Sequence, residues 1–301
     1  MRIESELCLK KLQERGIDAV DNVEMKDKTT LGIGGVAEIF VKIKSEWELV
    51  IVESMSKKYG LPLHILGFGS NILASDKGVS GIVMQFDNSF GQISFDGELV
   101  TINGNVGVGT LIKRAAEQNL GGLEGFVGIP ASVIGLVAMN GGAFGVEIGS
   151  LVKNVVVQTD GETRKILGKN CKFSYRNSRF INSKDIIFQT TLKLKKMDEN
   201  EIKKNMNNYI NLRKRTQPIF EKTAGSVYKN PKDEFAARLL QEVGLKGFRI
   251  NNVMFSDKHA NFIENLGGGK FDDVIKLIDI GREMVYNKYK IELETEIQML
   301  E

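Results

Sequence analysis

Cysteine, histidine and proline are scarce in this chain of 301 residues, which has two, two and four of them respectively. Cys8 and Cys171 stand far apart without a paired spacing, so the sequence indicates neither a disulfide framework nor a zinc site. Long apolar runs are lacking as well, and no membrane-spanning helix is expected. The first sixteen residues form a charged, amphipathic pattern that is unlike a signal peptide. We therefore expect a soluble protein of the reducing cytoplasm.

An excess of charge of one sign is also lacking, because 41 Lys and Arg stand against 38 Asp and Glu and leave a formal net charge of +3. This balance gives no reason to expect a nucleic-acid partner. No G-x-S-x-G, Walker loop, His-x-x-x-His pair or Cys-x-x-Cys occurs in the sequence. These absences disfavour a serine hydrolase with a nucleophile elbow, a P-loop enzyme and a zinc enzyme, and no metal site is expected.

Glycine, with 32 residues, is the abundant residue that needs an explanation. The densest stretch runs from Gly128 to Gly145, where five of eighteen residues are glycine and none is charged. A buried backbone of this kind offers many N–H groups and few side chains, which suits binding of a phosphate or a flat ring. Taken alone, the stretch favours a tightly packed core turn; the rest of the sequence changes that balance.

An α/β unit precedes this stretch. A strand pattern at Ala37–Ile43 is followed by a helix from Ser45, with Glu48 as its capping-box partner, and then by a short apolar strand at Pro62–Leu66. That strand runs into the glycine loop Gly67–Asn71, the usual place for a ligand loop. The third glycine of a dinucleotide fingerprint would fall at Ile72, so we reject the Rossmann reading.

Short strands punctuated by glycine follow between residues 81 and 109, the last of them at Val106–Val108, and Thr110 is expected to cap a helix. Asp160-Gly161 predicts a hairpin turn. A charged run at Lys195–Lys204 marks a domain boundary, and the chain ends in a strand pattern at Ile291–Leu300. The expected organisation is an N-terminal helix (1–20), two cofactor-binding subdomains (21–86 and 87–196) and a C-terminal substrate domain (197–301).

Few polar side chains stand in apolar or glycine-rich surroundings. Arg176, Ser226 and Glu296 are three of them, and each alone is more readily explained by a structural role: a surface-turn arginine, a capping serine and an edge-strand glutamate. His64 lies in an apolar strand pattern and is interpreted as structural. His259 lies in a polar turn, where a ligand contact and a structural role are equally balanced.

Taken in order, the motifs form one set, made up of Thr29–Gly35, Leu66–Asn71, Gly128–Pro130, Met139–Gly145, Tyr175–Ser178, Gln217-Pro218, Ala224–Pro231, Lys258–Ile263 and Leu293–Glu296. This set resembles the UDP-N-acetylenolpyruvoylglucosamine reductase family over nearly the whole chain. The length and the Lys-His-Ala-Asn-Phe-Ile run resemble the shorter of that family's two types, which lacks an extra substrate-covering loop. The sequence departs from the family's usual pattern at Gly32, Val36, Ala131 and Ile134, which puts details of cofactor contact in doubt.

The resemblance implies an α+β chain with the FAD-binding fold of the vanillyl-alcohol-oxidase type, built of two α/β subdomains, and a C-terminal α/β substrate domain. It implies non-covalent FAD, with NADPH as the hydride donor. The residues that it assigns to the cofactor are Gly34, Gly67, Phe68, Gly69, Ser70, Asn71, Gly128, Ile129, Pro130, Ser132, Gly135, Asn140 and Gly142.

The implied reaction is reduction of UDP-N-acetylglucosamine enolpyruvate to UDP-N-acetylmuramate for peptidoglycan synthesis. Hydride would reach C3 of the enolpyruvyl group from the reduced flavin. Arg176 and Glu296 would stabilise the enolate, and Ser226 would protonate C2. Implied substrate contacts are Tyr175, Arg213, Gln217, Lys229, Asn230 and His259. A solvated helix face remains an equal explanation for the basic residues among them.

Two other functions stay open. An oxidase of the same fold would pass electrons to oxygen, and many such enzymes bind flavin covalently through a histidine or cysteine; the first domain offers only His64 and Cys8. The oxidase reading leaves Ser226 and Glu296 without roles. A non-enzymatic flavin or sugar-nucleotide sensor would tolerate loss of the acid/base residues, yet all three are present. A monomer without a membrane or nucleic-acid partner is expected.

Overall fold

The computed structural model of the chain describes residues 2–301. They form two compact units, each built from several separate stretches of chain. Of these described residues, unit 1 comprises 2–22, 38–67 and 80–211, and unit 2 comprises 23–37, 68–79 and 212–301. These units divide the chain differently from the four expected segments, whose boundaries remain a prediction. Among the residues that the structure describes, no helix has both the length and the apolar character to cross a membrane.

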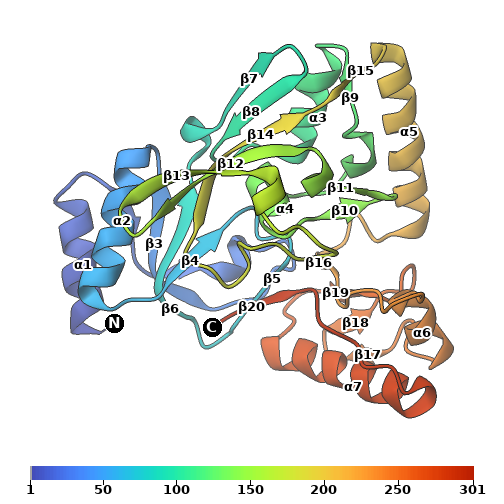
Figure 1. The fold of residues 1–301 in the computed structure, drawn as a ribbon. Helices are drawn as coiled ribbons and strands as arrows, with labels where there is room; N and C mark the ends of the chain where they lie inside the picture. Colours follow the sequence, from blue (N-terminus) through green and yellow to red (C-terminus); the bar gives the residue numbers. More distant parts are fainter. Residues whose placement is uncertain (1) are drawn as a thin grey trace. The chain divides into compact units, whose positions relative to one another are not determined.

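The first sheet of unit 1 is built around β3, whose alternate residues are fully buried. Helices α1 (Ile3–Gln13) and α2 (Glu46–Tyr59) lie side by side next to this sheet (Figure 1). Ser45 caps α2 by accepting the N–H of Glu48 at 3.2 Å, and Gly60 ends it in the left-handed conformation. In sheet order the strands are β1 (Asp18–Val20), β3 (Val36–Ile43), β6 (Val79–Phe86) and β4 (Leu63–Leu66).

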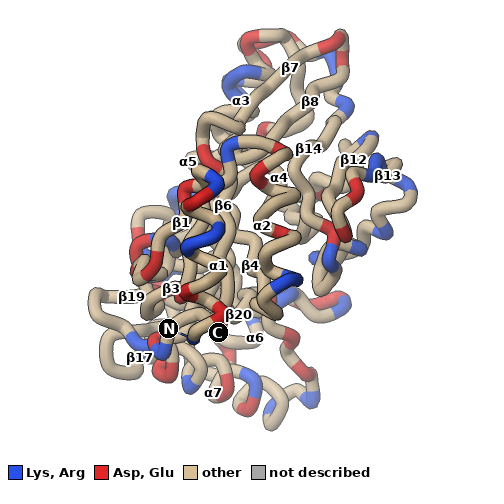
Figure 2. Tube along the Cα trace, turned by 90° about the vertical axis from the view of Figure 1, so that its left-hand side faces the viewer, with Lys and Arg blue, Asp and Glu red and all other residues tan. Residues whose placement is uncertain are grey.

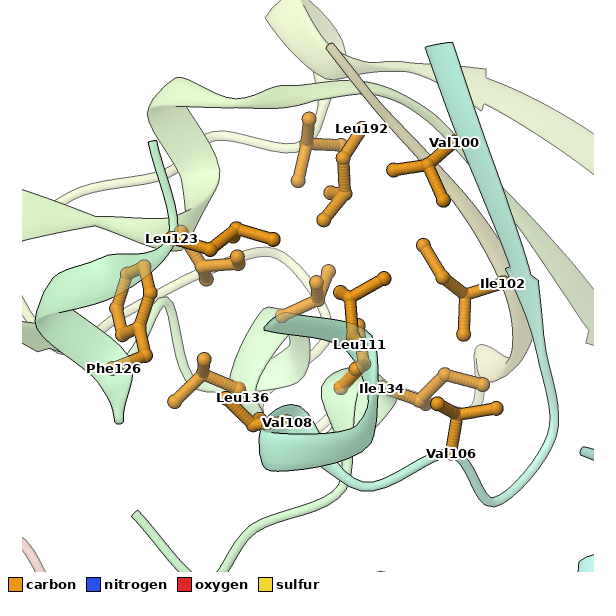
Figure 3. Close-up of a cluster of buried hydrophobic side chains, with 14 of the residues drawn as sticks. Val100, Ile102, Val106, Val108, Leu111, Leu123, Phe126, Ile134, Leu136 and Leu192 are labelled. Carbon is orange, nitrogen blue, oxygen red and sulfur yellow. The ribbon is translucent and has the colours of Figure 1, made fainter. Parts of the chain in front are cut away.

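The second sheet of unit 1 is antiparallel throughout. Its inner face packs on α3 (Val108–Ala116) and the short α4 (Val133–Ala138) in one apolar core, where the side chains point toward one another (Figure 3). The predicted hairpin at Asp160-Gly161 is confirmed, and both residues have positive φ as a two-residue turn requires. In sheet order the strands are β13 (Glu162–Leu167), β12 (Val152–Thr159), β14 (Ile186–Lys193), β8 (Leu99–Asn103) and β7 (Gln92–Asp96).

Smaller elements complete unit 1. A tight hairpin, β10 (Gly142–Ala143) with β11 (Val146–Glu147), lies within the glycine-rich stretch, and β9 (Leu120–Gly121) pairs with β15 (Lys195–Lys196). Helix α5 (Glu199–Thr216) starts in this unit and ends in unit 2. Short 3₁₀ turns connect these elements at Asn88–Phe90, Glu124–Phe126, Ile148–Ser150 and Gly168–Asn170.

Unit 2 has its own core, built on an antiparallel sheet that packs against the long helix α7 (Phe271–Tyr289) (Figure 1). Helix α6 (Ala236–Glu242) packs on α7 as well. The sheet contains, in order, β16 (Thr223–Ser226), β19 (Phe262–Asn265), β18 (Val253–Phe255) and β17 (Arg249–Ile250). Outside it lie a parallel pair, β5 (Ile72–Ala74) with β20 (Gln298–Leu300), and the 3₁₀ turn Met25–Asp27. The strand β2 (Val23–Glu24) pairs with residues 36–37 at the start of β3.

Two predicted elements are wrong. Val106–Val108 is not a strand: Gly107 forms only an isolated bridge with Ser132, and α3 already begins at Val108, two residues before the expected cap at Thr110. The apolar positions of α3 follow the helical period, which overrides the short alternation before it.

The expected C-terminal strand Ile291–Leu300 is wrong over residues 291–297, because only its last three residues form a strand, β20. The preceding residues contact the sheet region through one isolated bridge, between Tyr228 and Thr295. Basic and acidic residues are interspersed along the helices and hairpins of each unit, consistent with the small net charge (Figure 2).

Candidate active site

In unit 2, the two predicted glycine motifs pack on each other. Thr30 donates its N–H to the carbonyl of Gly69 at 3.1 Å. A Cβ at Gly69 would stand 2.1 Å from the carbonyl oxygen of Lys28, and its φ of +67° suits glycine. Gly34 is equally constrained, since a Cβ there would come 2.6 Å from the Cβ of Ala74. Close packing therefore explains these two glycines without a ligand.

In unit 1, Gly67 lies against the start of α4. A Cβ at Gly67 would come 2.7 Å from the Oγ of Ser132, and one at Gly135 would come 2.9 Å from the same oxygen. Ser132 caps α4 by accepting the N–H of Gly135 at 3.2 Å. Gly128 and Pro130, just before this cap, are exposed. Gly67, which has no side chain, thus lies beside the Ser132 hydroxyl and the exposed backbone of Gly128 and Pro130. This arrangement suits binding of the diphosphate of a nucleotide cofactor.

The two side chains that depart from the family pattern in this stretch face the protein interior. Ile134 is 7% exposed and points into the apolar cluster with Val106 and Leu136 (Figure 3). Ala131 packs against the same cluster. Their Cβ atoms therefore fill the core rather than the accessible side of the stretch.

Asn140 and Gly142 continue the stretch beyond α4. Asn140 has no exposed surface, and its side-chain amide contacts Glu147, Ser174 and the backbone of Gly149. A direct side-chain contact between Asn140 and a flavin is therefore not favoured by this geometry. Gly142 is part of β10 and is partly exposed.

Arg176 stands at the corner of a tight turn in unit 1. Ser174 and Asn177 close the turn by exchanging two backbone hydrogen bonds of 3.0 Å, and Arg176 itself has a φ of +51°. Its Nη2 donates to the carbonyl of Gly142 at 2.9 Å. Its guanidinium carbon lies 5.0 Å from the ring centre of Tyr175, which is 44% exposed. The fold thus holds this cation in one orientation despite its position on a loop.

In unit 2, Ser226 and Glu296 are brought onto adjacent chain segments. Ser226 ends β16, and the next residue, Val227, accepts the N–H of Glu296 at 2.8 Å. Asn71 joins them: its Nδ2 donates to the carbonyl of Glu296 at 3.0 Å, and its own carbonyl accepts the N–H of Gln298 at 2.9 Å. Gly225, beside Ser226, lies next to Ser70.

Tyr228 and Asn261 hold this arrangement together, and the sequence did not single out either of them as a site residue. The Asn261 side chain accepts the N–H of Tyr228 at 3.0 Å and donates to its carbonyl at 2.8 Å, as a paired strand would. The fully buried Tyr228 hydroxyl donates to the carbonyl of Ile278, and burial raises the pKa of this phenol. The only sequence signal was an asparagine directly before the apolar pair Phe262-Ile263.

The predicted substrate contacts of unit 2 have partners within the protein. Lys229 pairs with the exposed carboxylate of Glu294, and the Oδ1 of Asn230 accepts the N–H of Ala236 at 3.1 Å. The Nη1 of Arg213 donates to the Oε1 of Gln217 at 2.7 Å.

Two further groups have pKa values that burial shifts. Arg213 is only 6% exposed, and burial lowers the pKa of its guanidinium. The His259 ring packs edge-on against Phe262 with centroids 4.9 Å apart, and burial lowers the pKa of its imidazole by disfavouring the charged form. His64, interpreted as structural, lies 3.1 Å from the carbonyl of Ser80 through its Nε2.

Phe68 and Ile129, the other two predicted cofactor residues, are both partly exposed, Phe68 in unit 2 and Ile129 in unit 1. Over residues 2–301, no group of three or more His, Cys, Asp or Glu side chains is arranged to hold a metal ion.

Comparison with known proteins identifies the fold and the family of the chain. Residues 37–166 match the family described as "FAD binding domain", and residues 217–300 match "UDP-N-acetylenolpyruvoylglucosamine reductase, C-terminal domain". A solvent-stable cholesterol oxidase structure, 16% identical with a TM-score of 0.51, covers 60% of the chain and shares its fold over 38% of its own length. The expected fold, an FAD-binding domain of the vanillyl-alcohol-oxidase type with a further C-terminal domain, is confirmed.

Two relatives that match nearly the whole chain are named UDP-N-acetylenolpyruvoylglucosamine reductase. The UDP-N-acetylenolpyruvoylglucosamine reductase of Aquifex aeolicus is 38% identical over 93% of this chain and 94% of its own, and that of Bacillus subtilis is 33% identical over 98% of each. The crystal structure of the Thermus caldophilus enzyme superposes with a TM-score of 0.82 at 34% identity, over 95% of this chain and 100% of its own. The chain thus belongs to the UDP-N-acetylenolpyruvoylglucosamine reductase family of FAD-dependent UDP-N-acetylmuramate dehydrogenases, which reduce enolpyruvyl-UDP-N-acetylglucosamine to UDP-N-acetylmuramate in peptidoglycan synthesis.

Proposed function

We propose that the chain carries out this reduction with Arg176, Ser226 and Glu296 as its catalytic residues. The observation that carries the proposal is a backbone contact in unit 2, in which Val227, directly after Ser226, accepts the N–H of Glu296 beside the isolated bridge between Tyr228 and Thr295. Because the two segments are adjacent, the Ser226 hydroxyl and the Glu296 carboxyl can act on neighbouring atoms of one substrate. The family's reaction needs both a proton donor and a group that binds a carboxylate.

Arg176 meets the electrostatic demand of the reaction. Hydride addition at C3 of the enolpyruvyl group leaves negative charge on C2 and the carboxylate, and a fixed cation stabilises that charge more than it stabilises the ground state. The hydrogen bond from Arg176 to Gly142 and the ring contact with Tyr175 fix the guanidinium before the substrate arrives. A guanidinium also binds a carboxylate through two parallel hydrogen bonds, which a lysine cannot do.

Glu296 and Ser226 divide the remaining work. Glu296, in its protonated form, donates a hydrogen bond to the substrate carboxylate. Ser226 gives its hydroxyl proton to C2 and regains it from solvent. A serine hydroxyl is a weak acid, so this transfer depends on the strong basicity of the enolate. The Asn71 bond to the Glu296 carbonyl keeps the Glu296 segment in register while this occurs.

The residues around Gly67 would hold FAD. Ser132, Gly135 and the backbone from Gly128 to Pro130 would contact its diphosphate, where a side chain on Gly67 would collide with Ser132. When bound, FAD would accept hydride from NADPH and supply it to the substrate. Tyr175, Arg213, Gln217, Lys229, Asn230 and His259 would contact the sugar nucleotide. Lys229 would exchange Glu294 for a substrate phosphate, because Glu294 is 72% exposed and bound only weakly.

Ser226→Ala tests this assignment in two half-reactions on the FAD-loaded enzyme, followed by flavin absorbance in stopped flow. We expect reduction by NADPH to be unchanged, and reoxidation by UDP-N-acetylglucosamine enolpyruvate to slow by roughly 10²- to 10⁴-fold, the usual contribution of a general acid. The matched control is Ser256→Ala, because Ser256 is a buried serine of unit 2 whose oxygen only accepts backbone N–H groups. Equal losses in both half-reactions would remove Ser226 from the proposed role.

The same experiment separates the reductase from an oxidase. Fast reoxidation by oxygen without a response to the enolpyruvyl nucleotide would favour the oxidase. Chromatography with light scattering tests the expected monomer, and cell fractionation tests the expected cytoplasmic location. Limited proteolysis tests the four-segment organisation. The assignment to the shorter type, without the extra substrate-covering loop, is part of the proposal.

A further inference from the structure

The buried side-chain amide of Asn140 is hydrogen-bonded to the loop that carries Arg176. Asn140 has no exposed surface and a φ of +50°. Its Nδ2 donates to the Ser174 carbonyl at 2.7 Å and to the Glu147 Oε2 at 2.9 Å, and its Oδ1 accepts the N–H of Gly149 at 2.9 Å. Both donor hydrogens of the amide and its oxygen are therefore used inside the protein.

One of these bonds fixes the turn of Arg176. The Ser174 carbonyl that Asn140 contacts is the one that closes the turn by accepting the N–H of Asn177. The other side of the turn is tied to the same part of the chain, because the Ser178 Oγ donates to the carbonyl of Ala138 at 2.5 Å. The end of α4 thus holds the Arg176 turn on both sides.

The second bond fixes the acceptor of the guanidinium. Glu147 belongs to β11 and pairs with Gly142 of β10, whose carbonyl receives the Nη2 of Arg176. The fit is tight, because a Cβ at Gly142 would stand 3.0 Å from the Arg176 Nη1. The same amide therefore fixes both the turn that presents Arg176 and the hairpin that receives it.

We propose that Asn140 is a positioning residue for Arg176, which sets the direction of the guanidinium by tying the Ser174–Asn177 turn to the β10–β11 hairpin. The inference rests on the proposed role of Arg176 toward the substrate. It gives Asn140 a different task from the flavin contact expected from the sequence. Without such contacts, an arginine on a loop would adopt many rotamers, and most of them would not place its charge next to the enolate. A misplacement of about 1 Å costs about 100-fold in rate.

The chemistry explains why an amide is required at this position. The two groups opposite Nδ2 are a carbonyl and a carboxylate, which only accept hydrogen bonds. Asn140→Asp keeps the size of the side chain and the Oδ1 contact with Gly149, yet removes both donors and places a carboxyl beside Glu147. This variant therefore breaks the two contacts that reach Arg176 and leaves the third.

The matched control is Gln158→Glu. Gln158 is also a buried amide of unit 1; its Nε2 donates to the carboxylate of Glu53 at 3.1 Å and its Oε1 accepts from Thr163 at 3.1 Å. The substitution makes the same chemical change, an amide to a carboxyl against a carboxylate, on the hairpin between β12 and β13. Both variants are expected to lower the thermal midpoint, which accounts for a general loss of stability.

The test is single-turnover reoxidation of the NADPH-reduced enzyme over a range of enolpyruvyl nucleotide concentrations. For Asn140→Asp we expect a limiting rate about 100-fold below that of the native enzyme, with a much smaller rise in the half-saturating concentration and no change in flavin reduction by NADPH. Gln158→Glu should keep the native limiting rate. A loss shared equally by the two variants, or by the two half-reactions, would overturn the inference.

Arg176→Ala, alone and combined with Asn140→Asp, separates the inference from the proposed function. If Asn140 acts through Arg176, the second substitution adds little to the loss caused by the first. If the rate losses of the two single variants instead multiply in the double variant, Asn140 acts independently of Arg176. The inference would then fail while the role of Arg176 stands. A native limiting rate in Arg176→Ala would instead refute the proposed role of Arg176, whatever Asn140→Asp does.

Discussion

Glu53 on α2 anchors the tip of the hairpin between β12 and β13 in unit 1. Its carboxylate accepts the N–H groups of Asp160 at 2.6 Å and Gly161 at 3.1 Å, and Lys57 pairs with it at 2.9 Å. Burial acts to raise the pKa of Glu53, but Lys57, Gln158 and the two backbone N–H groups together lower it below its ordinary value. The charged form is therefore favoured in the folded protein.

Glu53→Gln should lower the free energy of unfolding at pH 7 by about 1–3 kcal/mol, because two backbone N–H groups lose a charged acceptor. Since folding lowers the pKa, the contribution of Glu53 is complete above its unfolded value of about 4.5 and is lost as the pH falls below that value. Urea unfolding at pH 7 and pH 4 measures this. The difference between native and variant proteins should shrink at the lower pH, and an equal difference at both would contradict the prediction.

For single residues, the sequence indicates which side chains are candidates but not where those side chains point. The sequence identified Arg176, Ser226 and Glu296 by their type and surroundings, whereas the direction of a side chain depends on partners far along the chain. Asn140 stood in a glycine-rich motif and was expected at the cofactor, but Ser174, 34 residues away, takes its amide. Likewise Ile134 could be placed in the core only once its neighbours in space were known.

At the level of elements, helix α7 lies against Tyr228 through a glycine. A Cβ at Gly281 would come 2.3 Å from the Tyr228 Oη and 3.2 Å from the Leu240 Cδ2. Tyr228 follows the segment that carries Ser226, and its ring is fully buried. The missing side chain at Gly281 thus allows α7 to approach the site segment closely.

Gly281→Ala should destabilise the protein by about 1–3 kcal/mol, as overpacking of a filled core does, although alanine is ordinarily the better helix former. Gly109→Ala in α3 is the control, because a Cβ there meets nothing within 4 Å and should stabilise by about 0.5–1 kcal/mol. Thermal or urea unfolding compares the two. A stabilised Gly281→Ala would show that Tyr228 moves away without cost.

Elements encoded by local signals were predicted well. The cap of Ser45 on α2 and the turn at Asp160-Gly161 act through neighbours in sequence, and the structure confirms both. The Glu48 carboxylate accepts the N–H of Lys44 rather than that of Ser45. The Glu296 segment was predicted as a strand and is not one, because its pairing with Tyr228 is a single bridge between distant parts of the chain. Alternation of apolar residues cannot report such a contact.

For the whole molecule, the order of the motifs carried the family assignment, and the relatives confirm it over nearly the full length. The fold class followed from that resemblance. The division into unit 1 and unit 2 could not be predicted in this way, because residues 23–37 and 68–79 join the unit that also contains residues 212–301. Hydrophobic periodicity predicts helices and strands, but it does not predict which of them pack or pair with each other.

Bound FAD should stabilise the folded chain, since a ligand that binds only the native state adds about 2.7 kcal/mol at a hundred times its dissociation constant. Purified protein is expected to be yellow and to lose both colour and several degrees of thermal midpoint when FAD is stripped. Added FAD should restore both. Differential scanning fluorimetry with absorbance at the flavin bands follows the two together, and protein that never takes up FAD would refute the cofactor assignment.

The parallel pair of β5 and β20 has a consequence for how the protein is made. Residues 72–74 leave the ribosome early, yet their strand partner is residues 298–300. Domains generally fold as units during synthesis, from the N-terminus onward. Here residues 72–74 must wait for their strand partner until more than two hundred further residues have been translated. Unit 2 therefore completes its folding only after the whole of unit 1 has been synthesised.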